Sequence, residues 1–209
     1  MLRLISTGTS SNSAEDNPKS LQRLVWLSLA LHFGKRGSEG WRGMNKQTFV
    51  QSVDDEGRQY LEYGSCEKQK NHPRDVEAAS YRSEARVYAR PGNPLCPVAA
   101  YEMYLSLLHT ELDALWQRPN DKWQPGRFWY YKAPLGDSSL NSMMKKMSSD
   151  AGLSKIYTNH CLRATASKGL ADAGFERTDI YVVTGHRNIK SLDPYINMPS
   201  DAKKNKIKY

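Results

Sequence analysis

Apolar residues recur every three to four positions in two long parts of the chain. The first run covers residues 21 to 31 and follows Asn17-Pro18, a pair typical of a helix start, while Gly34 is expected to end that helix. Because the apolar residues cover more than one stripe, this helix is predicted to be largely buried. The second run, residues 97 to 115, predicts one long helix.

Between these two runs the pattern changes to that of β-strands. Residues 48 to 53 and 59 to 63 flank the turn Asp54-Asp55-Glu56-Gly57, and this arrangement predicts a β-hairpin. Residues 85 to 89 predict a third strand, which is closed by a segment rich in Pro and Gly.

The rest of the chain is predicted to be helical after one irregular stretch. Residues 116 to 127 predict a loop, and residues 128 to 131 predict a short strand. Caps and glycines then predict four helices: from Ser138 to Gly152, from Thr158 or Asn159 to Gly174, from Thr178 to near Gly185, and from Ser191 onward.

Composition excludes several classes of protein for this chain of 209 residues. Its three cysteines (Cys66, Cys96 and Cys161) are widely spaced, so neither a disulfide framework nor a thiolate zinc site is indicated, and a reducing compartment is expected. The longest apolar stretch, residues 24 to 33, is far shorter than the roughly 18 residues that a membrane span needs. The first residues lack the apolar core of a secretory signal. We therefore expect a soluble, intracellular protein without a membrane partner.

The length fits one compact domain with small extensions. We expect a flexible N-terminal segment over residues 1 to 17, one domain over residues 18 to 200, and a basic C-terminal tail over residues 201 to 209. The sequence contains no internal repeat and no low-complexity linker.

The net charge of +8 is concentrated near the C-terminus. Residues 151 to 209 carry 10 basic and 5 acidic side chains, whereas residues 1 to 150 carry 20 and 17. A basic region favours a polyanionic partner, either nucleic acid or an acidic membrane surface, because counterion release supplies affinity that does not depend on sequence. Such an excess is also common on ordinary solvated surfaces, so the charge alone only favours nucleic acid.

The residues that suggest chemistry lie in this basic region. His160 and Arg163 are three positions apart on a predicted helix, so they project from one face and can reach the same oxyanion. His186 follows Gly185 at a predicted helix end, and Tyr195 comes nine positions later. Positive or proton-carrying groups beside a hydroxyl nucleophile suit phosphoryl transfer.

Attack on a phosphodiester explains why these residue types are needed. The pentavalent species carries extra charge on its non-bridging oxygens, which arginine neutralises with paired hydrogen bonds. A phenol has an ordinary pKa of about 10, so nearby cations or a base must assist removal of its proton. No carboxylate cage for magnesium accompanies these residues, which points to covalent chemistry without a metal or nucleotide cofactor.

The motif resembles a known family. His160-x-x-Arg163, Gly185-His186 and Tyr195 resemble the second motif block of the tyrosine recombinases, also called phage-type integrases. The resemblance covers residues 21 to 198. It implies a mainly α domain with a small antiparallel three-stranded β-sheet (α+β), the tyrosine recombinase catalytic core, with double-stranded DNA as its substrate.

The first motif block of that family also has a counterpart. Residues 33 to 39 resemble it, which makes Arg36 the first catalytic arginine and Glu39 its structural companion. The family keeps a catalytic lysine in a β-hairpin, for which Lys70 and Lys68 are the candidates. Lys70 is preferred because its neighbours best resemble the Thr-Lys-Thr stretch of eukaryotic relatives.

The resemblance also implies a role for each residue. The scissile phosphate would be held by Arg36, Arg163 and His186, while His160 would assist proton transfer. Lys70 would serve as general acid, and Tyr195 would attack phosphorus to form a 3′-phosphotyrosyl intermediate. No small-molecule substrate is expected, and a homo-tetramer on DNA is implied.

The most similar branch of the family is that of the Crypton-type transposon recombinases and the recombinase-like domains of MYM-type zinc-finger proteins. The similarity lies in residues 157 to 165 and in Ala173-Gly174-Phe175. It implies a nuclear protein.

Two alternatives to an active enzyme remain at this stage. A transposon-derived domain can keep the fold and basic face but act as an inactive module for DNA binding or protein interaction. An RNA-binding protein is the third possibility, although the exposed aromatic motifs typical of that class are absent.

Overall fold

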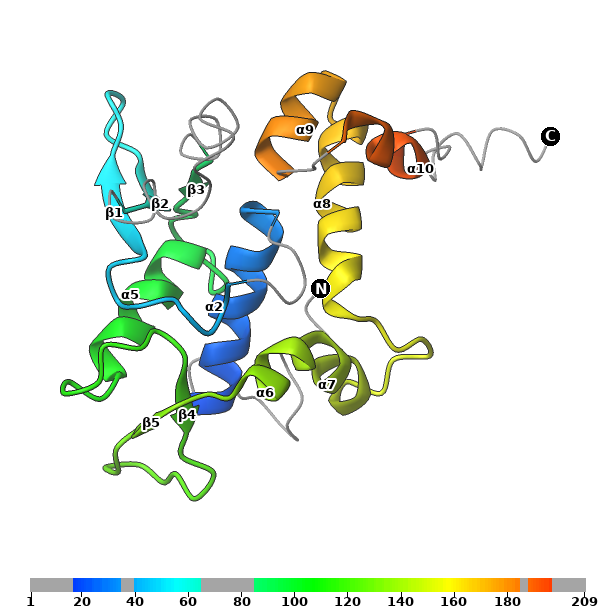
Figure 1. Cartoon of the computed structure of the whole chain (residues 1–209). Coiled ribbons are helices and arrows are strands. Elements are labelled where there is room, and N and C mark those ends of the chain that lie inside the picture. The colour runs from blue at the N-terminus through cyan, green and yellow to red at the C-terminus, as the bar shows by residue number, and fades with distance from the viewer. Residues whose placement is uncertain (1–16, 35–39, 65–84, 185–187, 197–209) are drawn as a thin grey trace.

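A computed structural model describes residues 17–34, 40–64, 85–184 and 188–196 (Figure 1). Helix α2, Pro18–His32, lies in the middle of the molecule. The side chain of Asn17 caps it by accepting a hydrogen bond from the Ser20 backbone N–H at 2.9 Å. Residues 21 to 30 are all buried, because neighbouring elements pack on several sides of the helix. The predicted buried helix is therefore confirmed.

Three short antiparallel strands form a sheet in the order β1-β2-β3 on one side of α2 (Figure 1). In the register, Phe49 is opposite Tyr63 and Leu61 is opposite Val87. The predicted hairpin is confirmed, whereas the third strand is shorter than the predicted residues 85 to 89. The strands are β1 (Phe49–Val53), β2 (Gln59–Tyr63) and β3 (Val87–Tyr88).

Helix α5, Pro97–Leu107, is shorter than the apolar pattern predicts. The prediction of one long helix over residues 97 to 115 is therefore wrong. Leu108 has extended backbone, and Gln117, with no exposed surface, supplies hydrogen bonds to the following loop. Its Oε1 accepts from the His109 N–H at 2.7 Å, while its Nε2 donates to the carbonyl of Leu112 at 3.0 Å. A buried amide therefore lets Leu115 reach the core without a helix.

A second antiparallel sheet pairs β4 (Gln117–Pro119) with β5 (Tyr130–Pro134). The prediction of a loop over residues 116 to 127 is wrong for its first part, and the strand predicted over residues 128 to 131 begins at Tyr130. Over the described residues the structure is therefore a mixed α/β fold with two small antiparallel sheets, where the sequence predicts one.

The helix predicted from Ser138 to Gly152 is divided in two. Helix α6 is Asp137–Asn141 and helix α7 is Met143–Asp150, with Ser142 between them. The Ser142 hydroxyl donates to the Ser138 carbonyl at 2.6 Å, which competes with regular helix geometry at this point. The helix also starts one residue before the predicted cap.

The C-terminal part consists of helices on the other side of α2 (Figure 1). Helix α8, Asn159–Asp172, has the predicted bounds, with Thr158 as N-cap and Gly174 at φ +86° beyond its end. Helix α9 includes Arg177, one residue before the position predicted to cap it. The predicted cap Ser191 is wrong, since Asn188 caps a 3-10 turn that contains Ser191. The bounds are α9 (Arg177–Thr184), η1 (Ile189–Leu192) and α10 (Asp193–Ile196).

Three tryptophans join these parts in the core. Trp41 is 2% exposed, and its ring centroid lies 5.3 Å from that of Trp26 and 5.6 Å from that of Trp116. Offset and edge contacts of this kind add to the free energy gained by burying the rings. Trp41 therefore fixes the chain that follows the undescribed residues 35–39 against α2.

None of the helices within the described residues is long and apolar enough to cross a membrane.

Candidate active site

Helix α8 carries two of the predicted site residues. Arg163 is 5% exposed and lies on the buried side of the helix with Asn159, Leu162 and Ser167. His160, three positions earlier, is exposed. A guanidinium stays charged at all ordinary pH values, so α8 holds a buried cation next to an exposed imidazole.

The start of α8 is fixed by Asn159, which is 5% exposed. Its Oδ1 accepts from the Met144 backbone N–H at 3.0 Å, and its Nδ2 donates to the Leu140 carbonyl at 2.9 Å. Both partners belong to the α6–α7 segment, so one side chain ties three helices together. Asn159 thereby sets the position of the turn that carries His160 and Arg163.

Replacing Asn159 by Ala is expected to lower the free energy of unfolding by about 1–3 kcal/mol, because a buried N–H and a buried carbonyl lose their partner. Urea unfolding followed by circular dichroism measures this loss. The control is Asn141→Ala, at an exposed helical position, which should stay within about 0.5 kcal/mol of wild type. Equal losses in the two variants would show that Asn159 has no anchoring role.

Around α8 lie the helix that carries Tyr195 and the two helices that precede Arg36 and His186. It contacts α2, α9 and α10. The ends of α2 and α9 also meet directly: a Cβ atom added to Gly34 would lie 2.9 Å from the Cα of Thr184. Gly34 and Thr184 are the last described residues before the segments 35–39 and 185–187.

Helix α10, which contains Tyr195, is held by side chains on both sides. Arg177 Nη1 donates to Asp193 Oδ1 at 2.6 Å, which joins the start of α9 to the start of α10. Leu192 is fully buried just before α10, and the side chain of Asn188 accepts from the Lys190 N–H at 2.9 Å. The backbone at Tyr195 therefore lies in a helix packed against α8, while its side chain is outside the described part of the structure.

Three predicted site residues lie outside the described residues. They are Arg36, Lys70 with its alternative Lys68, and His186. Glu39, the Lys-rich tail and most of the predicted N-terminal segment also fall outside.

His32, in the last turn of α2, forms a contact that the sequence analysis does not predict. Its Nδ1 lies 2.7 Å from the Ser28 carbonyl, so Nδ1 carries the proton and donates it. Its Nε2 lies 3.3 Å from Arg90 Nη2 and accepts from that guanidinium. Burial lowers the pKa of His32, the Ser28 carbonyl opposes this, and the Arg90 charge lowers it further.

This contact predicts a pH dependence of stability. Since the pKa of His32 is lower in the folded protein than its ordinary value of about 6.5, the unfolded state binds more protons as the pH falls through that value. The free energy of unfolding should therefore fall between pH 7.5 and pH 5.5. Urea titrations should show a smaller fall for His32→Gln than for wild type or for the control Asn141→Ala, whose exposed side chain does not titrate. The same fall in wild type and His32→Gln would contradict this prediction.

The sequence does not predict the buried hydrogen bonds of Asn159 or the contact of His32 with Arg90. Asn159 is a polar residue at a spacing otherwise occupied by buried residues, which is the signal that marks it. His32 sits within the apolar run of α2 and has no local signal for its partner Arg90, which is distant in the sequence.

Among the described residues, no three His, Cys, Asp or Glu side chains come together as metal ligands would. Cys96 and Cys161 are free thiols.

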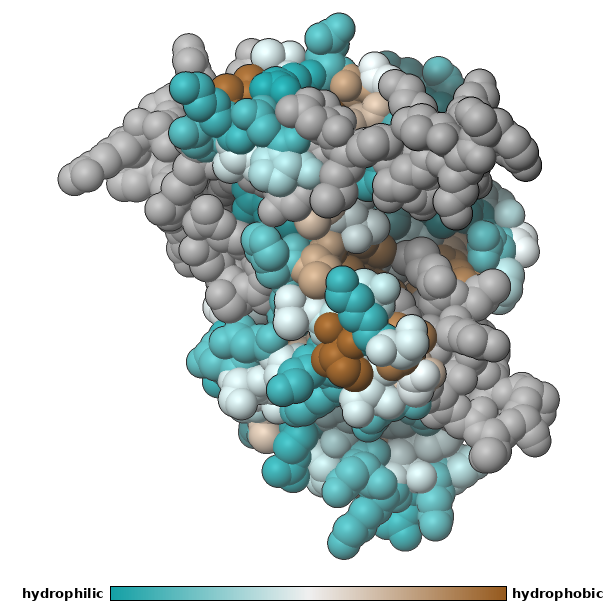
Figure 2. All heavy atoms as spheres, turned by 90° about the vertical axis from the view of Figure 1, so that its right-hand side faces the viewer, coloured by the Kyte–Doolittle hydropathy of each residue, from teal (hydrophilic) through white to brown (hydrophobic). Residues whose placement is uncertain are grey.

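The outer surface of this part is mostly hydrophilic. Figure 2 shows the molecule from the side of α8, α9 and α10, where polar residues predominate and a few apolar residues reach the surface. Among the side chains described in this part of the chain, the exposed large hydrophobic ones are Ile156, Tyr157, Phe175 and Ile189.

Comparison with known proteins gives a fold but no sequence family. No family model matches the sequence, and no curated protein matches it. Among solved structures, XerA recombinase is similar with a TM-score of 0.51 and 15% identity, over 99% of this chain and 59% of that chain. XerH site-specific recombinase, bound to palindromic difH substrate in a post-cleavage complex, has a TM-score of 0.54 and 12% identity, over 99% of this chain and 49% of that chain.

The fold is therefore similar to that of site-specific recombinases, and this chain spans about half to three fifths of the length of those structures.

Proposed function

We propose that this chain is the catalytic domain of a tyrosine recombinase, which cleaves and rejoins double-stranded DNA. The observation that carries the proposal is the packing of α2, α9 and α10 against α8, since these helices carry or directly precede the motif residues. His160 and Arg163 lie on α8, Tyr195 lies on α10, which α8 contacts, and the segments with Arg36 and His186 leave from Gly34 and Thr184, which touch.

The proposed reaction keeps the number of phosphate ester bonds constant. The phenolic oxygen of Tyr195 attacks the scissile phosphorus, and the bond from phosphorus to the 5′ oxygen breaks. His160 assists removal of the phenolic proton, and Lys70 donates a proton to the leaving 5′ oxygen. Attack by a 5′ hydroxyl on the 3′-phosphotyrosyl bond reverses these steps and rejoins a strand.

Charge stabilisation is the proposed role of the remaining groups. Arg163 supports this role because its guanidinium is buried, where a charge acts more strongly on a bound oxyanion than it does in water. Arg36 and His186 would complete the set of donors around the phosphate.

The finer parts of the proposal rest on sequence resemblance. The proposal includes three such finer parts: a homo-tetramer on DNA, a nuclear location and membership of the Crypton-type branch. The proposed substrate is double-stranded DNA. The XerH structure, which contains bound difH substrate, supports DNA as the partner.

A covalent trapping experiment tests the proposal. The full chain is incubated with a pool of nicked duplexes of randomised sequence, whose short cleaved strand diffuses away and prevents rejoining. We expect complexes that survive SDS, and peptide mapping by mass spectrometry should place the DNA on Tyr195.

Two results would contradict the enzyme proposal. DNA linked to another residue would mean that the nucleophile is wrongly assigned. Tight binding to the same duplexes with no covalent product would instead support the inactive DNA-binding module.

A further inference from the structure

The chain contains a second structured surface, formed by the β4–β5 loop at the opposite end of the molecule from α9 and α10 (Figure 1). Asn120, 7% exposed, organises this loop. Its Nδ2 donates to the Phe128 carbonyl at 3.0 Å, and its Oδ1 accepts from the Lys122 N–H at 3.1 Å and the Tyr131 hydroxyl at 3.0 Å. The rings of Trp123 and Trp129 pack with centroids 4.9 Å apart. The loop therefore has one fixed shape.

This fixed loop displays an aromatic side chain to solvent. Phe128 is 55% exposed, although its ring contacts Tyr131 with centroids 5.2 Å apart. Fully burying a phenylalanine stabilises a protein by about 1.5–3 kcal/mol, so leaving much of this ring in water forfeits part of that gain. A rigid backbone that holds an apolar ring outward is typical of a binding surface.

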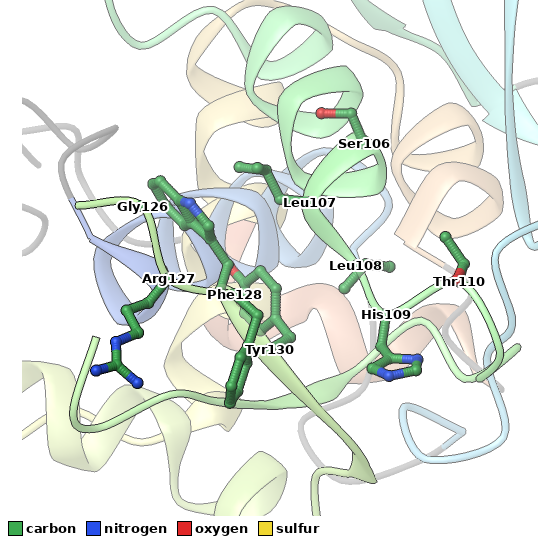
Figure 3. Close-up of a pocket in the computed structure, with 10 residues that line it drawn as sticks. Ser106, Leu107, Leu108, His109, Thr110, Gly126, Arg127, Phe128 and Tyr130 are labelled. Carbon is green, nitrogen blue, oxygen red and sulfur yellow. The ribbon is translucent and has the colours of Figure 1, made fainter. Parts of the chain in front are cut away.

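A pocket of about 560 Å³ lies beside Phe128, between the end of α5 and residues 126 to 130 (Figure 3). Its lining includes Leu107, Leu108 and Tyr130, which are apolar or present a ring. Figure 3 shows Arg127 extending at one side of the pocket and His109 and Thr110 at the other. The pocket can take one or two apolar side chains of a bound chain.

Positive side chains lie at the pocket and on the loop beside it. Arg127 lines the pocket, and Arg118 and Lys122 are exposed on the same β4–β5 segment. Within the described parts of the chain none of the three forms an ion pair with a carboxylate. The Arg118 guanidinium lies 4.3 Å from the centroid of the Tyr131 ring, which holds it beside the aromatic cluster. Two acidic residues lie close by: Glu111 forms an ion pair with Lys132, and Asp121 Oδ1 accepts from the Tyr131 hydroxyl at 3.3 Å. The three cations still outnumber the one carboxylate that is not in an ion pair.

His109 adds a donor to this rim. Its Nδ1 accepts from the Glu111 backbone N–H at 3.3 Å, so the neutral ring carries its proton on Nε2. A carboxylate or a peptide carbonyl is the complementary group.

We propose that this surface docks an acidic segment of a partner protein, with an apolar side chain in the pocket beside Phe128 and carboxylates on Arg118 and Arg127. The charge of the rim selects acidic residues, and the leucines of the pocket select an apolar side chain. A peptide fits these features better than a nucleic acid, because bases stack on open ring faces, whereas the Phe128 and Tyr131 rings meet edge-on at 69° and Arg118 covers one face of Tyr131. This surface lies away from α9 and α10, which carry or precede residues of the proposed active site (Figure 1).

Peptide selection followed by binding measurements tests this proposal. The purified full chain is used to select from a displayed library of random 12-residue peptides, and enriched peptides are synthesised with a fluorophore for anisotropy measurements. We expect enriched sequences to share a large apolar residue flanked by Asp or Glu. Phe128→Ser and Arg127→Glu should each weaken binding about tenfold or more.

The chain offers a matched control for each variant. Phe175→Ser removes a ring that is 54% exposed elsewhere, and Arg42→Glu reverses another exposed arginine. Both should bind as wild type does, and circular dichroism should show that all four variants are folded.

Three results would overturn the proposal. One is an enriched set without acidic residues, and another is equal binding by Phe128→Ser and wild type. The third is evidence that something other than a peptide occupies this surface. Loss of single-stranded oligonucleotide binding in Phe128→Ser would indicate a nucleic acid, and conversion of a dimer to a monomer would indicate a second copy of the chain.

Discussion

Tyr195→Phe is expected to reduce covalent trapping on nicked duplexes to background, since removal of the phenolic oxygen leaves no atom to bond to phosphorus. DNA binding should be unchanged, because the ring and the rest of helix α10 are kept. The two quantities are measured on the same samples, trapping by SDS gel and binding by anisotropy at one stated salt concentration. This separation of binding from bond formation distinguishes a nucleophile from a residue that only supports the fold.

Tyr157→Phe is the matched control for this experiment. Tyr157 is 37% exposed and directly precedes Thr158, the N-cap of α8. It is therefore a tyrosine close to His160 in the sequence that has no proposed chemical role. Its variant should trap DNA as wild type does. Equal trapping by wild type and Tyr195→Phe would remove Tyr195 from the reaction.

The ends of α2 and α8 could be predicted from the sequence, whereas the end of α5 and the start of α9 could not, and the predicted cap Ser191 is wrong. Asn17-Pro18 marks the start of α2, Gly174 follows the end of α8, and of the two caps predicted for α8, Thr158 and Asn159, the structure has Thr158. Each signal lies within one or two residues of the boundary that it determines. The pairing of β1 with β2 could also be predicted, because a short turn joins the two strands.

Features that depend on distant partners could not be predicted. The apolar pattern continues from α5 to Leu115, yet the buried amide of Gln117 holds residues 109 to 114 in a loop. Nothing in the local sequence says that this glutamine is buried. The same reason hides the link between His32 and Arg90, which joins the end of α2 to residues after β3.

In the candidate site, too, local features could be predicted and features that depend on distant partners could not. Spacing on one helix predicts that His160 and Arg163 share a turn of α8, but it does not predict that Arg163 is buried while His160 is exposed. Nor does it predict the contact between Gly34 and Thr184, which only the packing of α2 against the C-terminal helices creates.

Gly34→Ala is expected to lower the free energy of unfolding by about 2 kcal/mol or more, from two causes. Gly34 has φ +53°, where a side chain costs about 1 kcal/mol or more. In addition, the new methyl group would lie 2.9 Å from the Thr184 Cα, a backbone atom that cannot turn aside as a flexible side chain would. The ends of α2 and α9 would be forced apart, so trapping on nicked duplexes should fall more than urea unfolding alone explains.

Gly152→Ala separates the two causes. Gly152 has nearly the same backbone angle, φ +59°, but a Cβ there meets nothing within 4 Å. Its variant should lose about 1 kcal/mol from the backbone cost alone and trap DNA as wild type does under conditions where both proteins are folded. If the two variants lose the same stability and the same trapping, the contact between Gly34 and Thr184 does not position the proposed active site. A selective loss in Gly34→Ala would tie the joined ends of α2 and α9 to the reaction.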